Sequence, residues 1–207
     1  MRSSVRVAAW VVAGSVGVTG MSGTAMVSAQ TSPAPPGSRP TRPPPSPTTP
    51  PSQAIDCTWL AVDTATKTAT FQLIAGLTGL NGALNFNGFR DGGLTLTVPL
   101  GWTVVMHFKN NDGVLPHSAE VIPDAKPLPL GPVDPAFERA FTVKLMQGLQ
   151  AREEDDLRFV ANRVGSFLIL CAVPGHGAAG MWIRLVVSDT ARRPSLAATS
   201  AGGGGGS

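Results

Sequence analysis

A short loop in the C-terminal half of the chain combines three side chains that bind soft metal ions. Cys171, His176 and Met181 follow one another with the spacing C-x4-H-x4-M, and small or turn-forming residues separate them. A thiolate, an imidazole and a thioether together suit copper better than zinc, iron or magnesium. Two histidines, one cysteine and a weakly bound axial methionine form the ligand set of blue copper electron-transfer sites. The loop therefore predicts a mononuclear copper site that still lacks one imidazole.

The missing imidazole is expected from His117, which lies far upstream in the sequence Leu115-Pro116-His117-Ser118. Prolines beside His117 and near His176 stiffen the backbone around both rings. A stiff ligand frame suits a metal that must change its charge with little rearrangement. The predicted ligands of one type 1 copper ion are thus His117, Cys171, His176 and, in the axial position, Met181.

The histidine count argues against a copper enzyme. The chain contains three histidines, too few for the additional copper centres of a nitrite reductase or a laccase. The third one, His107, alternates out of phase with Val104, Met106 and Phe108, so we expect it to face solvent. A dinuclear copper site of the oxidase type needs two cysteines in one loop, and this loop has one. We therefore expect a protein without catalytic residues of its own.

Two further side chains that could bind metal are assigned to the core. The chain has two cysteines, and an exported protein with two cysteines invites a disulfide. Cys171 cannot be both a thiolate ligand and part of a disulfide, so we expect Cys57 to be a small buried side chain on the first strand. Met146, like Met106, lies in an apolar run and is expected to fill the core rather than to bind metal.

The ligands are expected to be positioned by β-strands. The sequence contains short apolar or alternating segments, which are separated by Gly, Pro, Asn and Asp. About eight strands at this spacing are typical of an all-β domain, a Greek-key β-sandwich. Cys171 would end a strand whose inward face, with Phe167 and Ile169, belongs to the core. The acidic run 153–156 is expected to be a solvated loop. The predicted strands are residues 57–62, 68–75, 94–98, 103–108, 141–145, 157–161, 166–171 and 181–187.

The two ends of the chain differ in composition from a globular domain. Residues 1–29 carry two arginines, then an uncharged stretch that ends in Val27-Ser28-Ala29, which indicates either a cleaved signal peptide or a retained membrane anchor. Residues 30–53 form a Pro-rich linker, and residues 191–207 a flexible Gly-rich tail. Residues 54–190 remain as one domain of ordinary size.

The net charge of the whole chain does not describe this domain. All 13 Asp and Glu residues lie within residues 54–190, but six of the 16 Lys and Arg residues lie outside it. The domain is therefore slightly acidic, although the chain as a whole carries a net charge of +3. It lacks the basic surface that nucleic-acid binding requires.

Four motifs resemble those of cupredoxins, and within that superfamily those of the sulfocyanin and rusticyanin group. They are Asn85-Phe-Asn-Gly88, Val98-Pro-Leu-Gly-Trp102, Leu115-Pro-His117 and the loop from Cys171 to Trp182, in the same order as in sulfocyanins. The resemblance covers about residues 68–188. It implies a cupredoxin-like sandwich with His117, Cys171, His176 and Met181 as copper ligands. Ser118 stands where many cupredoxins have Asn; rusticyanin resembles this chain in having Ser, which goes with a high redox potential.

The resemblance implies an exported electron-transfer protein of a respiratory chain. The expected partners are redox proteins such as a cytochrome or a terminal oxidase, which the acidic run 153–156 could attract if the partner is cationic. The expected location is the periplasm or another extracytoplasmic compartment, with a possible membrane tether through residues 7–29, and the expected state is a monomer. The alternative is an exported copper carrier or storage protein without a redox role. Carriers usually expose open Met and His clusters, so a closed loop on a sandwich favours electron transfer.

Overall fold

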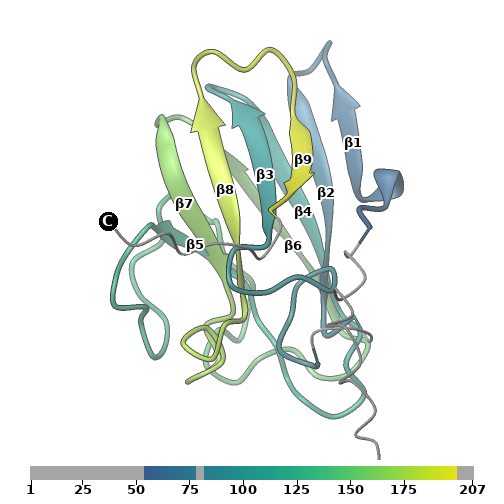
Figure 1. The fold of residues 1–207 in the computed structure, drawn as a ribbon, viewed down its shortest axis with the longest axis vertical. Coiled ribbons are helices and arrows are strands. Elements are labelled where there is room, and N and C mark those ends of the chain that lie inside the picture. The colour runs from purple at the N-terminus through teal and green to yellow at the C-terminus, as the bar shows by residue number, and fades with distance from the viewer. Residues whose placement is uncertain (1–53, 78–81, 200–207) are drawn as a thin grey trace, which may run out of the picture. The chain divides into compact units, whose positions relative to one another are not determined.

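Two mixed β-sheets pack face to face in the computed structural model, which describes residues 54–77 and 82–199 (Figure 1). The first sheet has the strand order β1-β2-β4-β6 and the second β5-β7-β8-β3-β9. The pairs β2–β4 and β3–β8 are parallel, and the others are antiparallel. The predicted all-β sandwich is confirmed. The strands are β1 Leu60–Asp63, β2 Thr68–Ala75, β3 Leu94–Pro99, β4 Thr103–Asn110, β5 Glu120–Pro123, β6 Glu154–Val160, β7 Gly165–Leu170, β8 Trp182–Ser188 and β9 Ser195–Ala198.

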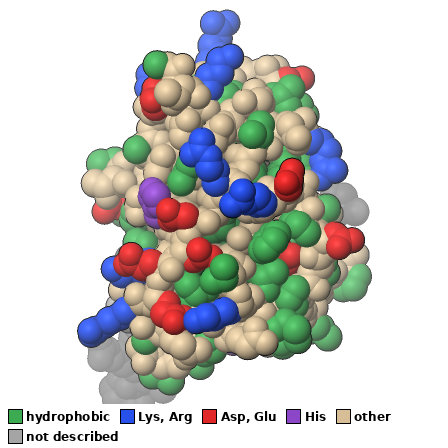
Figure 2. All heavy atoms as spheres, turned by 180° about the vertical axis from the view of Figure 1, so that it is seen from behind, with side chains coloured by type: hydrophobic (Ala, Val, Ile, Leu, Met, Phe, Trp, Pro, Cys, Tyr) green, Lys and Arg blue, Asp and Glu red, His purple; other side chains and the backbone are tan. Residues whose placement is uncertain are grey.

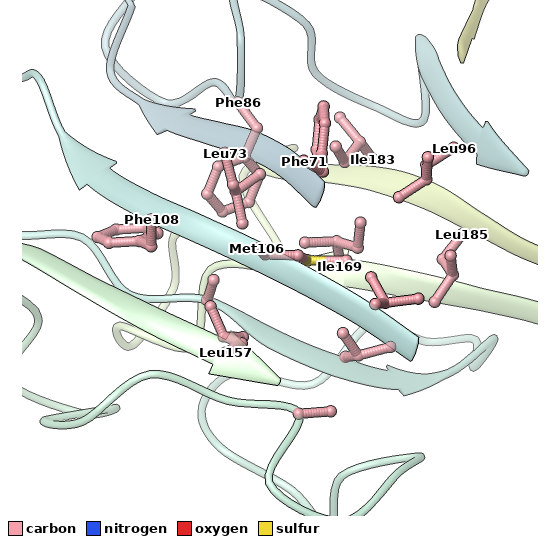
Figure 3. Close-up of a cluster of buried hydrophobic side chains, with 14 of the residues drawn as sticks. Phe71, Leu73, Phe86, Leu96, Met106, Phe108, Leu157, Ile169, Ile183 and Leu185 are labelled. Atoms are coloured by element: carbon pink, nitrogen blue, oxygen red, sulfur yellow. The ribbon is translucent and has the colours of Figure 1, made fainter. Parts of the chain in front are cut away.

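Alternating inward-facing side chains of β2 and β4 enter the core between the sheets. In β2 and β4 every second side chain is buried, because neighbouring residues of a strand point to opposite faces. Figure 3 shows how the inward side chains of both sheets meet. Met106 lies between its strand neighbours Phe71 and Leu157. Ile169 and Ile183 belong to the facing sheet. This packing makes a rigid frame for the loops at either end.

Several predicted parts of the chain lie outside the described residues. These are the signal peptide or anchor, residues 1–29, the Pro-rich linker, residues 30–53, and the glycine run at the C-terminus. Among residues 54–77 and 82–199, no helix is both long and apolar enough to cross a membrane.

The prediction for Cys57 was wrong. Residues Cys57–Trp59 form a 3-10 turn before β1, and Cys57 is exposed there. Asp56 stabilises the turn, because its carboxylate accepts a hydrogen bond from the Thr58 amide at 2.8 Å. Both cysteines are free, as expected from the ligand loop.

The predicted strand 141–145 does not form. Only an isolated bridge between Phe141 and Glu120 remains there, and Met146 beyond it is exposed, not in the core. Two strands were missed instead. β5 falls in a proline-rich stretch, and β9 lies in the predicted tail 191–207, so the folded domain extends past residue 190. Both are short and depend on pairing with a neighbouring strand rather than on their own apolar pattern.

The acidic run 153–156 was predicted as a loop, but most of it belongs to β6. Glu154 pairs with Lys109 at 2.8 Å, and Asp156 with His107 at 2.6 Å, across from β4. On this outer face basic and acidic side chains intermingle (Figure 2). Opposite charges on neighbouring strands attract one another, which allows an acidic sequence to enter a sheet.

Candidate metal centre

Two connections at one end of the sandwich bring the predicted ligands together. The β4–β5 connection carries His117, and the β7–β8 connection begins with Cys171 and ends with Met181 (Figure 1). Because β4 and β7 end at the same end of the sandwich, residues distant in sequence meet there. The core fixes the strand ends and therefore the positions of the ligand loops.

Three predicted ligands form a compact cluster. One ligand atom each of His117, Cys171 and His176 lies within 4.8 Å of the others. The two imidazole rings are 5.3 Å apart between centroids, and Cys171 Sγ lies 3.7 Å from Nδ1 of His176. Among the described atoms, Nδ1 of His117 is buried without a hydrogen-bond partner. An unpaired buried nitrogen beside a thiol and a second imidazole fits a soft metal ion such as copper.

Met181 is held next to this cluster by its backbone. The Cys171 amide donates to the Met181 carbonyl, and the Met181 amide donates to the His176 carbonyl, both at 3.0 Å. The Met181 side chain is fully buried. The fourth predicted ligand is therefore tied to two of the other three.

The β2–β3 connection holds the ligand loop from the side, a role that the sequence did not reveal. The Arg90 guanidinium donates to the Ala179 carbonyl, and the Asp91 amide donates to the Gly180 carbonyl at 2.9 Å. Gly180 has a φ of +102°, and a Cβ there would lie 2.5 Å from Arg90 and Asp91. A glycine is needed at this close approach.

Burial favours the neutral forms of the three clustered side chains. Burial raises the pKa of the Cys171 thiol, although hydrogen bonds from the backbone of Ser118 and Val173 oppose the shift. Burial also lowers the pKa values of His117 and His176. Neutral imidazoles are ready to bind metal, whereas the thiol must lose its proton on binding.

Ser118 contacts the cysteine ligand directly. Its amide nitrogen lies 3.5 Å from Cys171 Sγ, and its hydroxyl donates to the Leu145 carbonyl at 2.8 Å. The hydroxyl thus connects the His117 loop to the segment before β6, whereas the amide faces the sulfur. Hydrogen bonds to a ligand sulfur are one of the factors that set the potential of such a site.

His107 lies outside the cluster, as predicted. It is on the outer face of β4, its side chain is 44% exposed, and Nδ1 pairs with Asp156. It faces away from the core residues Met106 and Phe108.

Replacing His107 by Gln is expected to leave copper content, colour and midpoint potential unchanged, because the side chain contributes nothing to the cluster. Copper analysis, visible absorption and cyclic voltammetry of the variant check this. Loss of copper from His107→Gln, with His117→Gln harmless, would show that the wrong upstream histidine had been assigned.

Glu120 is a buried acid that the sequence did not identify. It begins β5 and is fully buried. One carboxylate oxygen, Oε1, has no partner among the described atoms, and the other accepts from the Val133 amide at 3.3 Å. Burial raises the pKa of Glu120 above its usual value, against the Val133 hydrogen bond.

Glu120→Gln is expected to stabilise the metal-free protein at pH 7 by on the order of 1 kcal/mol, because a neutral amide avoids the cost of keeping a buried carboxylate charged. A raised pKa in the folded state means that Glu120 does not destabilise the fold at a pH below the pKa of the unfolded chain. The destabilisation grows as pH rises above that value and is complete once pH exceeds the folded pKa. The gain should therefore disappear in acid. Urea unfolding of both proteins at neutral and acid pH measures it, with the exposed Glu138→Gln as control. An equal gain at both pH values would contradict the assignment.

Comparisons with known proteins agree with the site chemistry. Residues 56–197 match the family model described as the sulfocyanin (SoxE) domain. The sulfocyanin of Sulfolobus acidocaldarius is 24% identical over 138 residues, which cover 63% of this chain and 69% of that protein.

Solved copper proteins also show similarity. Rusticyanin from Thiobacillus ferrooxidans is 22% identical, with a TM-score of 0.46, over 63% of this chain and 88% of that one. Auracyanin A, a blue copper protein from Chloroflexus aurantiacus, is 24% identical, with a TM-score of 0.42, over 58% of this chain and 99% of that one.

Proposed function

This chain belongs to the sulfocyanin (SoxE) domain family, and we propose that it is an exported blue copper protein that carries single electrons in a respiratory chain. Membership implies blue copper electron transfer in general. We further propose that His117, Cys171, His176 and, in the axial position, Met181 bind the copper. The proposal also includes export and a role in a respiratory chain. The observation that carries it is the closed cluster of one buried thiol and two imidazoles at the end of a rigid sandwich.

The residues of this chain would hold copper in a frame that changes little between oxidation states. Copper bound there supplies a one-electron Cu(II)/Cu(I) couple. Cys171 and Met181 stand at the two ends of one loop, and their backbones are hydrogen-bonded to each other. On the other side, His117 is fixed by reciprocal backbone hydrogen bonds with Leu149, at 3.1 and 2.7 Å. Such pre-organisation lowers the rearrangement that each electron transfer requires.

An apolar surface around His176 supports docking of a redox partner. His176 is the one clustered ligand that is not fully buried. Val114 is 86% exposed and Leu130 73% exposed; Val114 lies in the His117 loop, and the Leu130 carbonyl accepts from the Gly175 amide next to His176. A small apolar contact area suits a short-lived complex with a cytochrome or a terminal oxidase. Electrons would enter and leave through the exposed edge of His176, and the protein acts as a monomer.

Export is supported by the sequence before the linker. Residues 1–29 have the two-arginine start, uncharged centre and small-residue end of a secretory signal. We place the copper domain in the periplasm or another extracytoplasmic compartment, either released or tethered through residues 7–29.

A copper carrier is the alternative, and one experiment separates the two functions. The protein loaded with one copper ion per chain is examined by cyclic voltammetry, then mixed with an excess of a copper chelator and, separately, with reduced cytochrome c. An electron-transfer protein gives a reversible one-electron wave, oxidises the cytochrome and retains its copper. Rapid loss of copper to the chelator without a reversible wave would assign it as a carrier.

A further inference from the structure

A buried carboxylate faces the histidine ligand of the β4–β5 connection. Asp112 Oδ2 lies 3.4 Å from Nε2 of His117, and the two side chains are 10% and 0% exposed. The sequence Asp112-Gly113 predicts a turn, but a turn alone does not explain why the acid is buried against an imidazole. Carboxylates are rarely buried without a partner, so the pairing requires an explanation.

Backbone hydrogen bonds fix the direction of this carboxylate. Oδ1 of Asp112 accepts from the amides of Val114 and Leu115, at 2.8 and 3.0 Å. The Asp112 amide donates to the buried Asn110 side chain at 2.9 Å. One carboxylate oxygen is therefore used by the loop itself, and the other is turned towards His117.

The end of β2 lies close to the backbone and Cβ of Asp112. Gly76 has a φ of +63°, and a Cβ on it would lie 2.6 Å from the Asp112 Cβ. The Asn111 amide donates to the Ala75 carbonyl at 2.9 Å, which fixes the loop against the end of β2. The contact between Asp112 and His117 is thus part of the frame.

The two nitrogens of the His117 ring have different surroundings. Nε2 faces Asp112, whereas Nδ1 is buried without a partner among the described atoms. A neutral imidazole carries its proton on one nitrogen and offers the other to a metal. Carboxylates that accept from the outer nitrogen of a histidine ligand fix its tautomer and ring orientation.

We propose that Asp112 is a positioning residue for His117: it accepts the Nε2–H, keeps Nδ1 free for copper, and with its negative charge favours Cu(II) over Cu(I). This inference rests on the proposed copper site. At 3.4 Å the contact is longer than a usual N–H···O hydrogen bond of about 2.7–3.2 Å, so its effect is mainly electrostatic. A charge acts more strongly in a buried place than in water. Asp112 thus opposes the soft Met181 sulfur, which favours Cu(I).

The matched pair Asp112→Asn and Asp156→Asn tests the charge. Both remove a carboxylate that faces a histidine, one buried at His117 and the other exposed at His107. The asparagine introduced by Asp112→Asn can still accept from the Val114 and Leu115 amides through its side-chain oxygen, so the loop keeps these hydrogen bonds. Mutation of the group that accepts a hydrogen bond from the non-coordinating nitrogen of a histidine ligand typically lowers metal affinity by about 10–100-fold.

We expect Asp112→Asn to lower the preference for Cu(II) over Cu(I) about tenfold, which equals a rise of about 59 mV in midpoint potential for one electron. Asp156→Asn should leave the potential unchanged. An unchanged or lower potential in Asp112→Asn, or equal shifts in both variants, would overturn the proposal.

A second measurement needs neither copper nor a variant. Nitrogen-15 NMR of the metal-free wild-type protein, at a pH where the ring is neutral, reports which nitrogen of His117 carries the proton. We expect the Nε2–H tautomer; the Nδ1–H tautomer would overturn the proposal even if Asp112→Asn does not fold. A wild-type protein that forms no blue centre would instead refute the proposed function, and the tautomer would still be measurable.

Discussion

Replacing Cys171 by Ser is expected to abolish the blue colour of the copper(II) protein completely. The colour of such a site arises from charge transfer between a thiolate sulfur and Cu(II), and a hydroxyl cannot supply it. Cys171 is buried next to both imidazoles, so no other sulfur of comparable reactivity replaces it in the described site. The visible absorption spectrum of the copper-loaded variant measures the loss.

Cys57→Ser is the matched control, because Cys57 is exposed in the 3-10 turn and far from the ligand loops in sequence. It should keep the full colour. Thermal unfolding of the metal-free proteins shows whether Cys171→Ser retains its fold, as expected for a change of one atom. A blue Cys171→Ser protein would refute the ligand assignment.

Substitutions of Met181 are expected to move the midpoint potential in opposite directions. Glutamine introduces a harder oxygen donor that supports Cu(II), so Met181→Gln should lower the potential. Leucine removes the donor and leaves Cu(II) less supported, so Met181→Leu should raise it. A shift on the order of 60 mV in either direction corresponds to a tenfold change in the preference between oxidation states.

Cyclic voltammetry of both variants at one pH checks this prediction. Leucine is close to methionine in volume, so the buried position of residue 181 tolerates it. Met106→Leu is the control, since Met106 is equally buried but lies in the core between the sheets (Figure 3). Shifts of the same sign in Met181→Gln and Met181→Leu would mean that Met181 is not the axial ligand.

The cluster of ligands could be predicted because its chemistry is local. Cys171, His176 and Met181 lie in one loop, and their types alone select copper. Alternation likewise predicted β2 and β4, where every second side chain enters the core. His107 was assigned correctly by the same alternation.

What could not be predicted depends on contacts between distant segments. β9 forms because β3 offers a free edge for pairing, and its own sequence shows little apolar pattern. Met146 is apolar but exposed, and the segment around it belongs to no strand. The buried acids Asp112 and Glu120 contact Gly76 and Val133, which nothing in the local sequence connects to them.

The visible absorption spectrum of the purified wild-type protein, loaded with one Cu(II) ion per chain, tests the central claim most directly. A thiolate from Cys171 and imidazoles from His117 and His176 predict one intense band towards the red end of the visible spectrum, which disappears on reduction and returns on reoxidation. A pale protein with only weak absorption in that region would show that Cys171 does not bind the metal, and would contradict the blue copper assignment.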